Sequence, residues 1–167
     1  MKKSLLRALP LLIILPLMLA ACTTGEEDPP SQTSITITGL GAGLKADFPA
    51  WDGTNGTVIL KLASSTSLDQ VARSIITGMS QGDASSTFDL YNPDNFHDWT
   101  GGGNFLIEVE VNLNLQGAGV YIYTAGKTID ELGGLAGLES GVNVPRLSIS
   151  AGGNTTVHFN QFKRVIF

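Results

Sequence analysis

Apolar side chains recur at every second position over most of the chain after Ser34. The clearest case is Phe105–Leu115, where one face is apolar, the other carries Glu and Asn, and only Leu106 departs from the alternation. A period of two is typical of a strand with one buried face and one wet face, as in antiparallel sheets. The same pattern predicts further strands at Ser34–Gly39, Thr57–Ala63, Thr87–Tyr91, Gly119–Thr124, Arg146–Ser150 and Thr155–Phe159.

Turn-forming residues separate these segments. They are Asp52-Gly53, Asn55-Gly56, Gly82-Asp83 and Gly152-Gly153-Asn154. Glycine and asparagine tolerate the positive φ angles of tight hairpin turns. Short strands at this spacing predict an all-β fold, an antiparallel β-sandwich. A β-barrel is the alternative, because alternation alone does not separate the two.

The segment Ser67–Gly78 has two interpretations. Its apolar residues have helical spacing, and Ser67 with Gln70 resembles a capping box. A strand would instead pair with Thr87–Tyr91 around the turn near Gly82. The pattern slightly favours one short helix at the start of the segment, followed by a strand.

The amino-terminal residues have the layout of an export signal. Lys2, Lys3 and Arg7 precede an uncharged run, Ala8 to Ala21, which contains two prolines. A bilayer-spanning helix needs roughly 20 apolar residues, so this run is short for a permanent transmembrane segment. We therefore predict a signal peptide over residues 1–21.

The end of this run, Leu19-Ala20-Ala21-Cys22, resembles the lipobox of bacterial lipoproteins. The resemblance implies that a signal peptidase recognises Leu19, Ala20 and Ala21, cuts before Cys22, and leaves a cysteine that carries lipid. Two or more acyl chains give a stable membrane anchor. Cys22 is the single cysteine of the chain, so no disulfide is expected.

Residues 22–33 read as a flexible tether and residues 34–167 as a single β-rich domain. The tether is rich in acidic residues and contains Pro29-Pro30. Thr23 stands where an aspartate retains some lipoproteins in the inner membrane. We therefore expect a cell-envelope protein at the outer membrane, with its periplasmic or surface face left open.

Charge narrows the class of partner. The chain has a net charge of −5, which becomes −8 after cleavage, because three of the ten basic residues and none of the fifteen acidic residues precede Cys22. An acidic surface disfavours nucleic acid. Metal cations, neutral glycans and envelope proteins stay open as partners.

Three segments of the second half resemble β-rich modules of spirochaete-type lipoproteins. They are Trp99-Thr100-Gly101-Gly102-Gly103-Asn104-Phe105, Tyr121-Ile122-Tyr123-Thr124-Ala125-Gly126-Lys127 and Val157-His158-Phe159-Asn160-Gln161-Phe162. These modules have no assigned activity. The resemblance implies an envelope location and a β fold.

Aromatic residues are the first candidates for ligand binding. Trp51 and Trp99 lie in polar, glycine-rich loops, and we expect Tyr121 and Tyr123 on outer strand faces. Exposed rings stack on sugars or anchor protein partners. For the two tryptophans the favoured interpretation is that both fold back and close the ends of the sandwich.

Oxygen-bearing side chains in the loop before Trp99 are candidates for Ca²⁺. Asp94, Asn95 and Asp98 offer the hard ligands that calcium prefers. The same residues are common in ordinary turns, which is the favoured interpretation. No other cofactor is expected.

Two patterns raise the alternative of a small envelope hydrolase. Gly78-Met79-Ser80-Gln81-Gly82 matches the nucleophile elbow G-x-S-x-G, with His158 later in the chain. Glu108 and Glu110 share a strand face about 6.6 Å apart, a spacing seen in glycosidases. The elbow requires an α/β fold, and catalytic acids come from different elements around a cleft. We therefore predict a non-catalytic binding or structural module.

Overall fold

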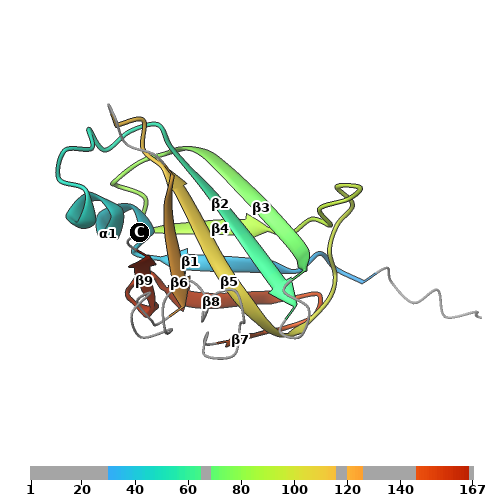
Figure 1. Cartoon of the computed structure of the whole chain (residues 1–167). Coiled ribbons are helices and arrows are strands. Elements are labelled where there is room, and N and C mark those ends of the chain that lie inside the picture. Colours follow the sequence, from blue (N-terminus) through green and yellow to red (C-terminus); the bar gives the residue numbers. More distant parts are fainter. Residues whose placement is uncertain (1–29, 65–68, 116–119, 126–145, 166–167) are drawn as a thin grey trace, which may run out of the picture.

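The computed structural model describes residues 30–64, 69–115, 120–125 and 146–165. Two β-sheets pack face to face, and one helix covers one end (Figure 1). The predicted sandwich is therefore confirmed. The barrel alternative is wrong for the described strands, because they form two separate sheets and neither closes on itself.

The smaller sheet is centred on the first strand, β1 (Ser34–Thr38). It pairs antiparallel with β4 (Ser85–Asp89) and parallel with β8 (Asn154–His158). Ile35 and Ile37 of β1 are fully buried, as is Phe88 of β4. On the other face, the Thr36 and Thr87 hydroxyls lie 2.9 Å apart in a hydrogen bond between strands.

The larger sheet supplies the other half of the core. Its order is β3 (Gln70–Met79), β2 (Gly56–Ser64), β5 (Gly103–Asn112), β6 (Tyr121–Ala125) and β9 (Phe162–Val165), while β7 (Arg146–Ile149) pairs with the start of β5. All of these pairings are antiparallel. The buried residues Leu60 and Val109 are direct partners in the register of β2 and β5. Apolar cross-strand pairs of this kind stabilise a sheet.

The outer face of β2 and β5 is polar. Lys61 of β2 forms salt bridges with Glu108, at 3.2 Å, and with Glu110. Burial works against the charge on the ammonium, but the two carboxylates outweigh it and raise the pKa of Lys61. The two glutamates therefore neutralise a neighbouring cation.

The predicted strands are confirmed, each overlapping an observed one with small shifts at its ends. The helix expected at the start of Ser67–Gly78 is wrong from residue 70 onward, since β3 begins at Gln70 and pairs with β2. The alternative pairing with Thr87–Tyr91 is reduced to one isolated bridge, Arg73 to Tyr91. Branched residues such as Val71 and Ile75 favour strands once a partner strand is present. Residues 65–68, including Ser67, lie outside the described ranges.

The helix lies elsewhere, directly after β1. Helix α1 (Leu40–Asp47) begins after Gly39, whose φ of 72° is left-handed. Leu40 and Leu44 are fully buried in the core. At the end of the helix, the Lys45 ammonium donates to the carbonyls of Pro49, at 3.0 Å, and Trp51.

Two glycines let α1 approach its neighbours closely. A Cβ at Gly41 would meet backbone atoms of Ser80 and Gln81, and one at Gly43 would overlap the ring of Phe159. Each close approach requires the absence of a side chain.

In the described part of the chain, no helix is long and apolar enough to cross a bilayer.

Gly43→Ala should destabilise the domain although alanine favours helices. The added methyl would lie 2.7 Å from Phe159 Cε1, as well as overlapping Cδ1, so the ring or the helix must move. We expect the free energy of unfolding to fall by about 1–3 kcal/mol, as for other overpacked sites. Urea denaturation measures it.

Gly82→Ala is the matched control, because its Cβ would be 3.6 Å from its nearest contact, Ser80 Oγ. It should change the free energy of unfolding by less than about 0.5 kcal/mol. Equal effects of the two substitutions would contradict the close packing inferred at Gly43.

Candidate functional site

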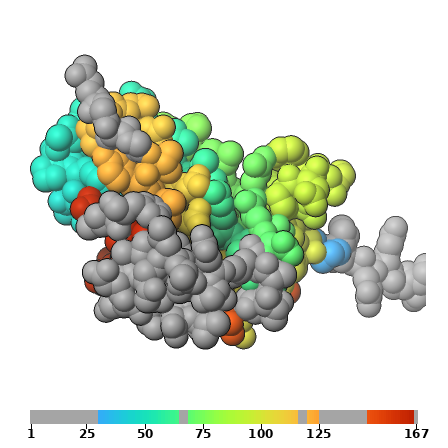
Figure 2. All heavy atoms as spheres, in the orientation of Figure 1, coloured from blue at the N-terminus to red at the C-terminus, as the bar shows by residue number. Residues whose placement is uncertain are grey.

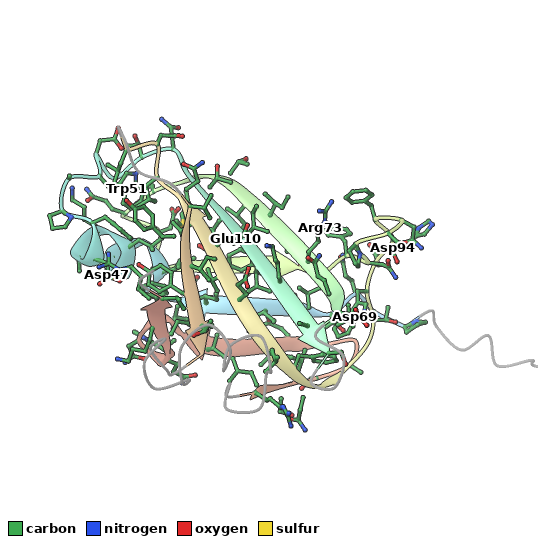
Figure 3. The ribbon with its side chains drawn as sticks, in the orientation of Figure 1. Asp47, Trp51, Asp69, Arg73, Asp94 and Glu110 are labelled. Carbon is green, nitrogen blue, oxygen red and sulfur yellow. The ribbon has the colours of Figure 1, made fainter. Side chains whose placement is uncertain are left out.

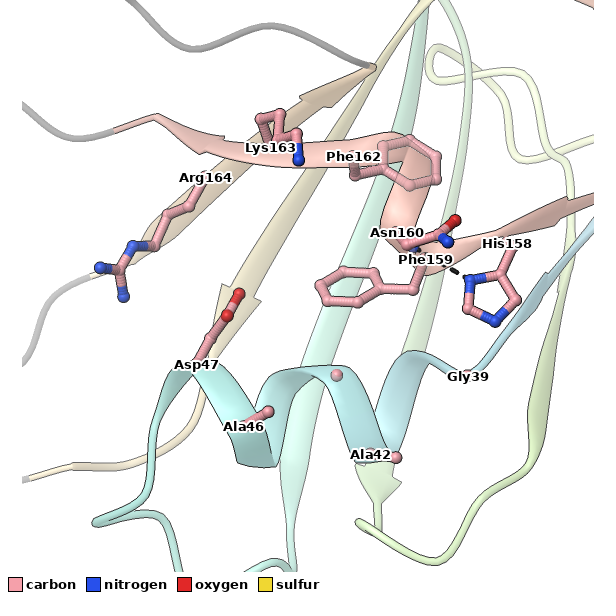
Figure 4. Close-up of a pocket in the computed structure, with 11 residues that line it drawn as sticks. Gly39, Ala42, Ala46, Asp47, His158, Phe159, Asn160, Phe162, Lys163 and Arg164 are labelled. Carbon is pink, nitrogen blue, oxygen red and sulfur yellow. Dashed lines mark hydrogen bonds between the residues drawn. The ribbon is translucent and has the colours of Figure 1, made fainter.

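A cleft of about 680 Å³ lies between α1 and the last described elements of the chain. One wall is α1 with Gly39, and the other is the end of β8, the short 3₁₀ helix η1 (Phe159–Gln161) and β9 (Figure 4). Since β1 and β8 are parallel, their carboxyl ends meet at this end of the sandwich. The cleft is larger than two other hollows lined by described residues, which have volumes of about 240 and 110 Å³.

The helix wall of the cleft is made of small residues. Ala42 and Ala46 line the cleft, with Asp47 at its far end (Figure 4), and Gly43 also belongs to this wall. Ala42 and Ala46 end at a methyl group and leave space between the walls, whereas Gly43 lies directly against the ring of Phe159. Polar groups are thereby concentrated on the opposite wall.

The opposite wall carries side chains with hydrogen-bond donors. His158 Nδ1 accepts a hydrogen bond from the Asn160 amide at 3.1 Å, which fixes the imidazole at the start of η1. The buried ring of Phe159 packs on Tyr123, with centroids 5.0 Å apart. Asn160 and Lys163 complete this wall.

The charge in the cleft is positive on balance. Lys163 and Arg164 line it together with one carboxylate, Asp47. Neither cation forms a salt bridge with a described residue. The Arg164 guanidinium instead lies 5.0 Å from the centre of the Phe48 ring, in a cation–π contact.

Asp47 is already engaged. Its Oδ2 accepts a hydrogen bond of 2.8 Å from the hydroxyl of Tyr123. The residue Tyr123 is 1% exposed. Burial, followed by the bond to this carboxylate, raises the pKa of Tyr123 far above its ordinary value of 10.0. Two cations and an occupied carboxylate suit a ligand that carries a negative group.

The structure does not bring the four aromatic candidates together. Trp51 is 1% exposed and its Nε1 donates to the Thr54 carbonyl at 2.8 Å, so it closes one end of the core. Tyr123 points into the core. The burial of Trp51 agrees with the favoured interpretation, in which it closes an end of the sandwich. The outward position expected for Tyr123 is wrong, because Tyr123 lies on the inward face of β6.

Trp99 and Tyr121 are half-buried and lie at opposite ends of the sandwich. Trp99 makes an edge-to-face contact with Phe105 at 5.3 Å, near the start of β5. Tyr121 packs on Phe48 at 4.1 Å and pairs with Val111, near the end of β5. They therefore do not form one aromatic platform.

The candidate calcium ligands belong to an exposed loop. Asn95 Oδ1 accepts a hydrogen bond from the His97 amide at 3.0 Å, and Asp94 donates its amide to Asn92 Oδ1 at 2.9 Å. Asp98 forms a backbone bridge with Tyr91. Within the described ranges, no three His, Cys, Asp or Glu side chains are placed to hold a metal ion.

The hydrolase candidates have structural partners. Ser80 lies in the turn between β3 and β4, where its Oγ accepts a bond from the Gly82 amide at 3.1 Å. This strand–turn–strand setting differs from the strand-to-helix turn of a nucleophile elbow. Glu108 and Glu110 are both paired with Lys61.

Comparison with known proteins adds no family to this picture. No family model matches the chain, and neither the curated proteins nor the solved structures give a match.

The sequence did not identify Asp47, Lys163 and Arg164 as site residues. The adjacent cations of Lys163-Arg164 were a usable signal, since basic residues are few in this chain. Their meeting with Asp47 depends on the tertiary packing of α1.

Tyr123→Phe measures how much the hydrogen bond between Tyr123 and Asp47 contributes to the free energy of unfolding. Loss of a bond to a charged acceptor should lower the free energy of unfolding near pH 8 by about 1.5–3 kcal/mol. Because the pKa of Tyr123 is raised on folding, its contribution is complete below pH 10.0 and is lost as pH rises above it. Between pH 8 and about pH 11, the free energy of unfolding should therefore fall by about 1 kcal/mol less in the variant than in the wild type.

Tyr121→Phe on the same strand is the control, because the Tyr121 hydroxyl makes no hydrogen bond within the described ranges. Urea denaturation at both pH values should give wild-type behaviour for this variant. An unchanged pH dependence in Tyr123→Phe would contradict the assignment.

Proposed function

We propose that the protein is a lipid-anchored, non-catalytic binding module of the bacterial cell envelope. Lipid on Cys22 holds it to a membrane, and the cleft beside α1 binds a small ligand with a negatively charged group. The observation that carries the binding role is a cleft lined by Lys163 and Arg164 in an otherwise acidic chain. A purely structural protein without a ligand would not require a cleft lined by cations.

The anchor rests on the amino-terminal sequence. Lys2, Lys3 and Arg7, the uncharged run and Leu19-Ala20-Ala21-Cys22 occur in the order of a lipoprotein signal. Thr23 after the cysteine favours the outer membrane. From Cys22 to Thr33, an extended chain reaches at most about 40 Å, so the domain stays close to the lipid surface.

The cleft and the tether lie at opposite ends of β1. The chain enters the domain before Ser34, crosses the smaller sheet in β1, and turns directly into α1 (Figure 1). Asp47, by the cleft, is likewise at the opposite end from Arg73 and Asp94 (Figure 3). An anchored domain can thus present the cleft away from the membrane.

A non-catalytic role is favoured by what the catalytic candidates do. The Ser80 hydroxyl accepts a turn hydrogen bond, the two glutamates neutralise Lys61, and His158 Nδ1 caps η1. Each group has a structural task. An anion-binding cleft needs only donors and cations, which His158, Asn160, Lys163 and Arg164 supply.

Replacing Cys22 tests the anchor. Cells that express the full chain with Cys22→Ser should incorporate no labelled palmitate into it, because the acceptor thiol is absent. Thr24→Ser, two residues along, should keep the label. Palmitate that persists in Cys22→Ser would refute the anchor.

Reversing one charge tests the cleft. Inorganic phosphate titrated into the ¹⁵N-labelled domain should shift amide signals of residues 158–164, and Lys163→Glu should weaken the binding at least about tenfold, or 1.4 kcal/mol. Lys163 suits this test because it makes no described side-chain bond.

Arg73→Glu makes the same change of charge at the other end of the sandwich and is the control. In this variant the phosphate-induced shifts of residues 158–164 should follow the wild-type titration. Equal weakening by both substitutions would indicate a general charge effect. No shift in residues 158–164 would refute the proposed site.

A further inference from the structure

The chain enters the domain beside one projecting loop, Tyr91–Trp99. The Thr33 amide donates to the Trp99 carbonyl at 2.8 Å, and the Leu90 amide donates to the Thr33 carbonyl at 3.0 Å. Thr33 is fully buried, so this junction is fixed. Figure 2 shows the yellow-green loop standing out from the body next to the blue first residues.

The loop is closed by its own hydrogen bonds. The Asn92 amide donates to the His97 carbonyl, and the Phe96 amide donates to the Asn92 carbonyl, both at 2.9 Å. Two turns made by Asn92 and Asn95 side chains hold the tip. The position of Phe96 is therefore set by the fold.

Phe96 has a backbone conformation that phenylalanine rarely adopts. Its φ is 58°, in the left-handed region where glycine or asparagine is the ordinary choice. Its side chain is 63% exposed and does not belong to the core. A strained, exposed aromatic residue that adds nothing to the core points to a contact outside the domain.

The chemistry around Phe96 suits a lipid surface. The Arg73 guanidinium lies 4.6 Å from the centre of the ring, so an apolar face and a cation are side by side. Exposed phenylalanine rings bury themselves at the boundary between the headgroups and the acyl chains, and guanidinium groups pair with the phosphates of the headgroups. Asp94 and Asp98 in the same loop favour a zwitterionic surface over an anionic one.

We propose that Phe96 inserts into the membrane surface that carries the lipid on Cys22, with Arg73 at the headgroups. This contact rests on the proposed lipid anchor. A short tether holds the loop at a high effective concentration near the bilayer, so one ring suffices to orient the domain. The cleft beside α1 then faces away from the membrane.

Brominated lipids test the contact, because bromine quenches nearby tryptophan. The full-length lipidated protein with Phe96→Trp is reconstituted in brominated phosphatidylcholine vesicles, and its emission is compared with that of the wild type. We expect the added tryptophan to lose at least half of its emission. Val120→Trp is the control. Val120 is 55% exposed and lies near the end of β5, whereas Phe96 lies near its start. The emission of a tryptophan at position 120 should therefore not be quenched.

Flotation of the same vesicles separates the two proposals. Protein that floats while Phe96→Trp is quenched no more than Val120→Trp overturns the membrane contact and leaves the anchor intact. Protein that does not float refutes the anchor and the contact together.

Phe96→Gly tests whether the ring is structural. Glycine relieves the backbone strain, so the Tm should stay equal or rise by a few degrees. A fall in Tm would show that the ring stabilises the fold through Arg73, and would overturn the argument for an external contact.

Discussion

The close approach of α1 to the rest of the domain depends on Gly41 and Gly43. Gly41 lies against the backbone of Ser80 and Gln81, and Gly43 lies against the ring of Phe159. At this distance the leucines of α1 reach the core, and Asp47 reaches the Tyr123 hydroxyl. Ala42 and Ala46 of the same helix line the cleft. The packing of α1 therefore closes the core and also forms one wall of the candidate site.

The two ends of the sandwich differ in chemistry. At the α1 end, the cations Lys163 and Arg164 border an open cleft. At the other end, Phe96 and Arg73 stand beside the point where the chain enters. Between these ends, Lys61 is paired with two glutamates on the outer face of the larger sheet. The two candidate contact surfaces thus lie at opposite ends of the sandwich.

The strands could be predicted because their signal is local. In Phe105–Leu115, the residues Ile107, Val109 and Val111 alternate, and all three are buried. The helix could not be predicted, because Leu40–Asp47 contains two glycines and has no side-chain cap. Its stability comes from packing on partners that are distant in the sequence. The helix predicted at the start of Ser67–Gly78 was wrong for the same reason. The apolar residues have helical spacing, but pairing with β2 makes Gln70–Met79 a strand.

The candidate site was less accessible to sequence reasoning than the fold. Tyr123 lies between Ile122 and Thr124 in a segment where apolar and polar residues do not alternate clearly. The pattern therefore did not indicate which face of β6 is inward, and the hydroxyl of Tyr123 suggested a solvent-exposed face. Burial is acceptable only because Asp47 accepts its hydrogen bond, across 76 residues of chain. Trp51 likewise lies in a loop, and its burial follows from the way that this loop folds against the core. Such partners are set by tertiary structure alone.

The parallel pairing of β1 with β8 also fixes an order of events during synthesis. The partner of Ser34 is Asn154, so the central strand of the smaller sheet lacks one neighbour until almost the whole chain is present. Contacts that are so far apart in sequence form late and slow folding. The smaller sheet is therefore completed only after the last strands have been synthesised.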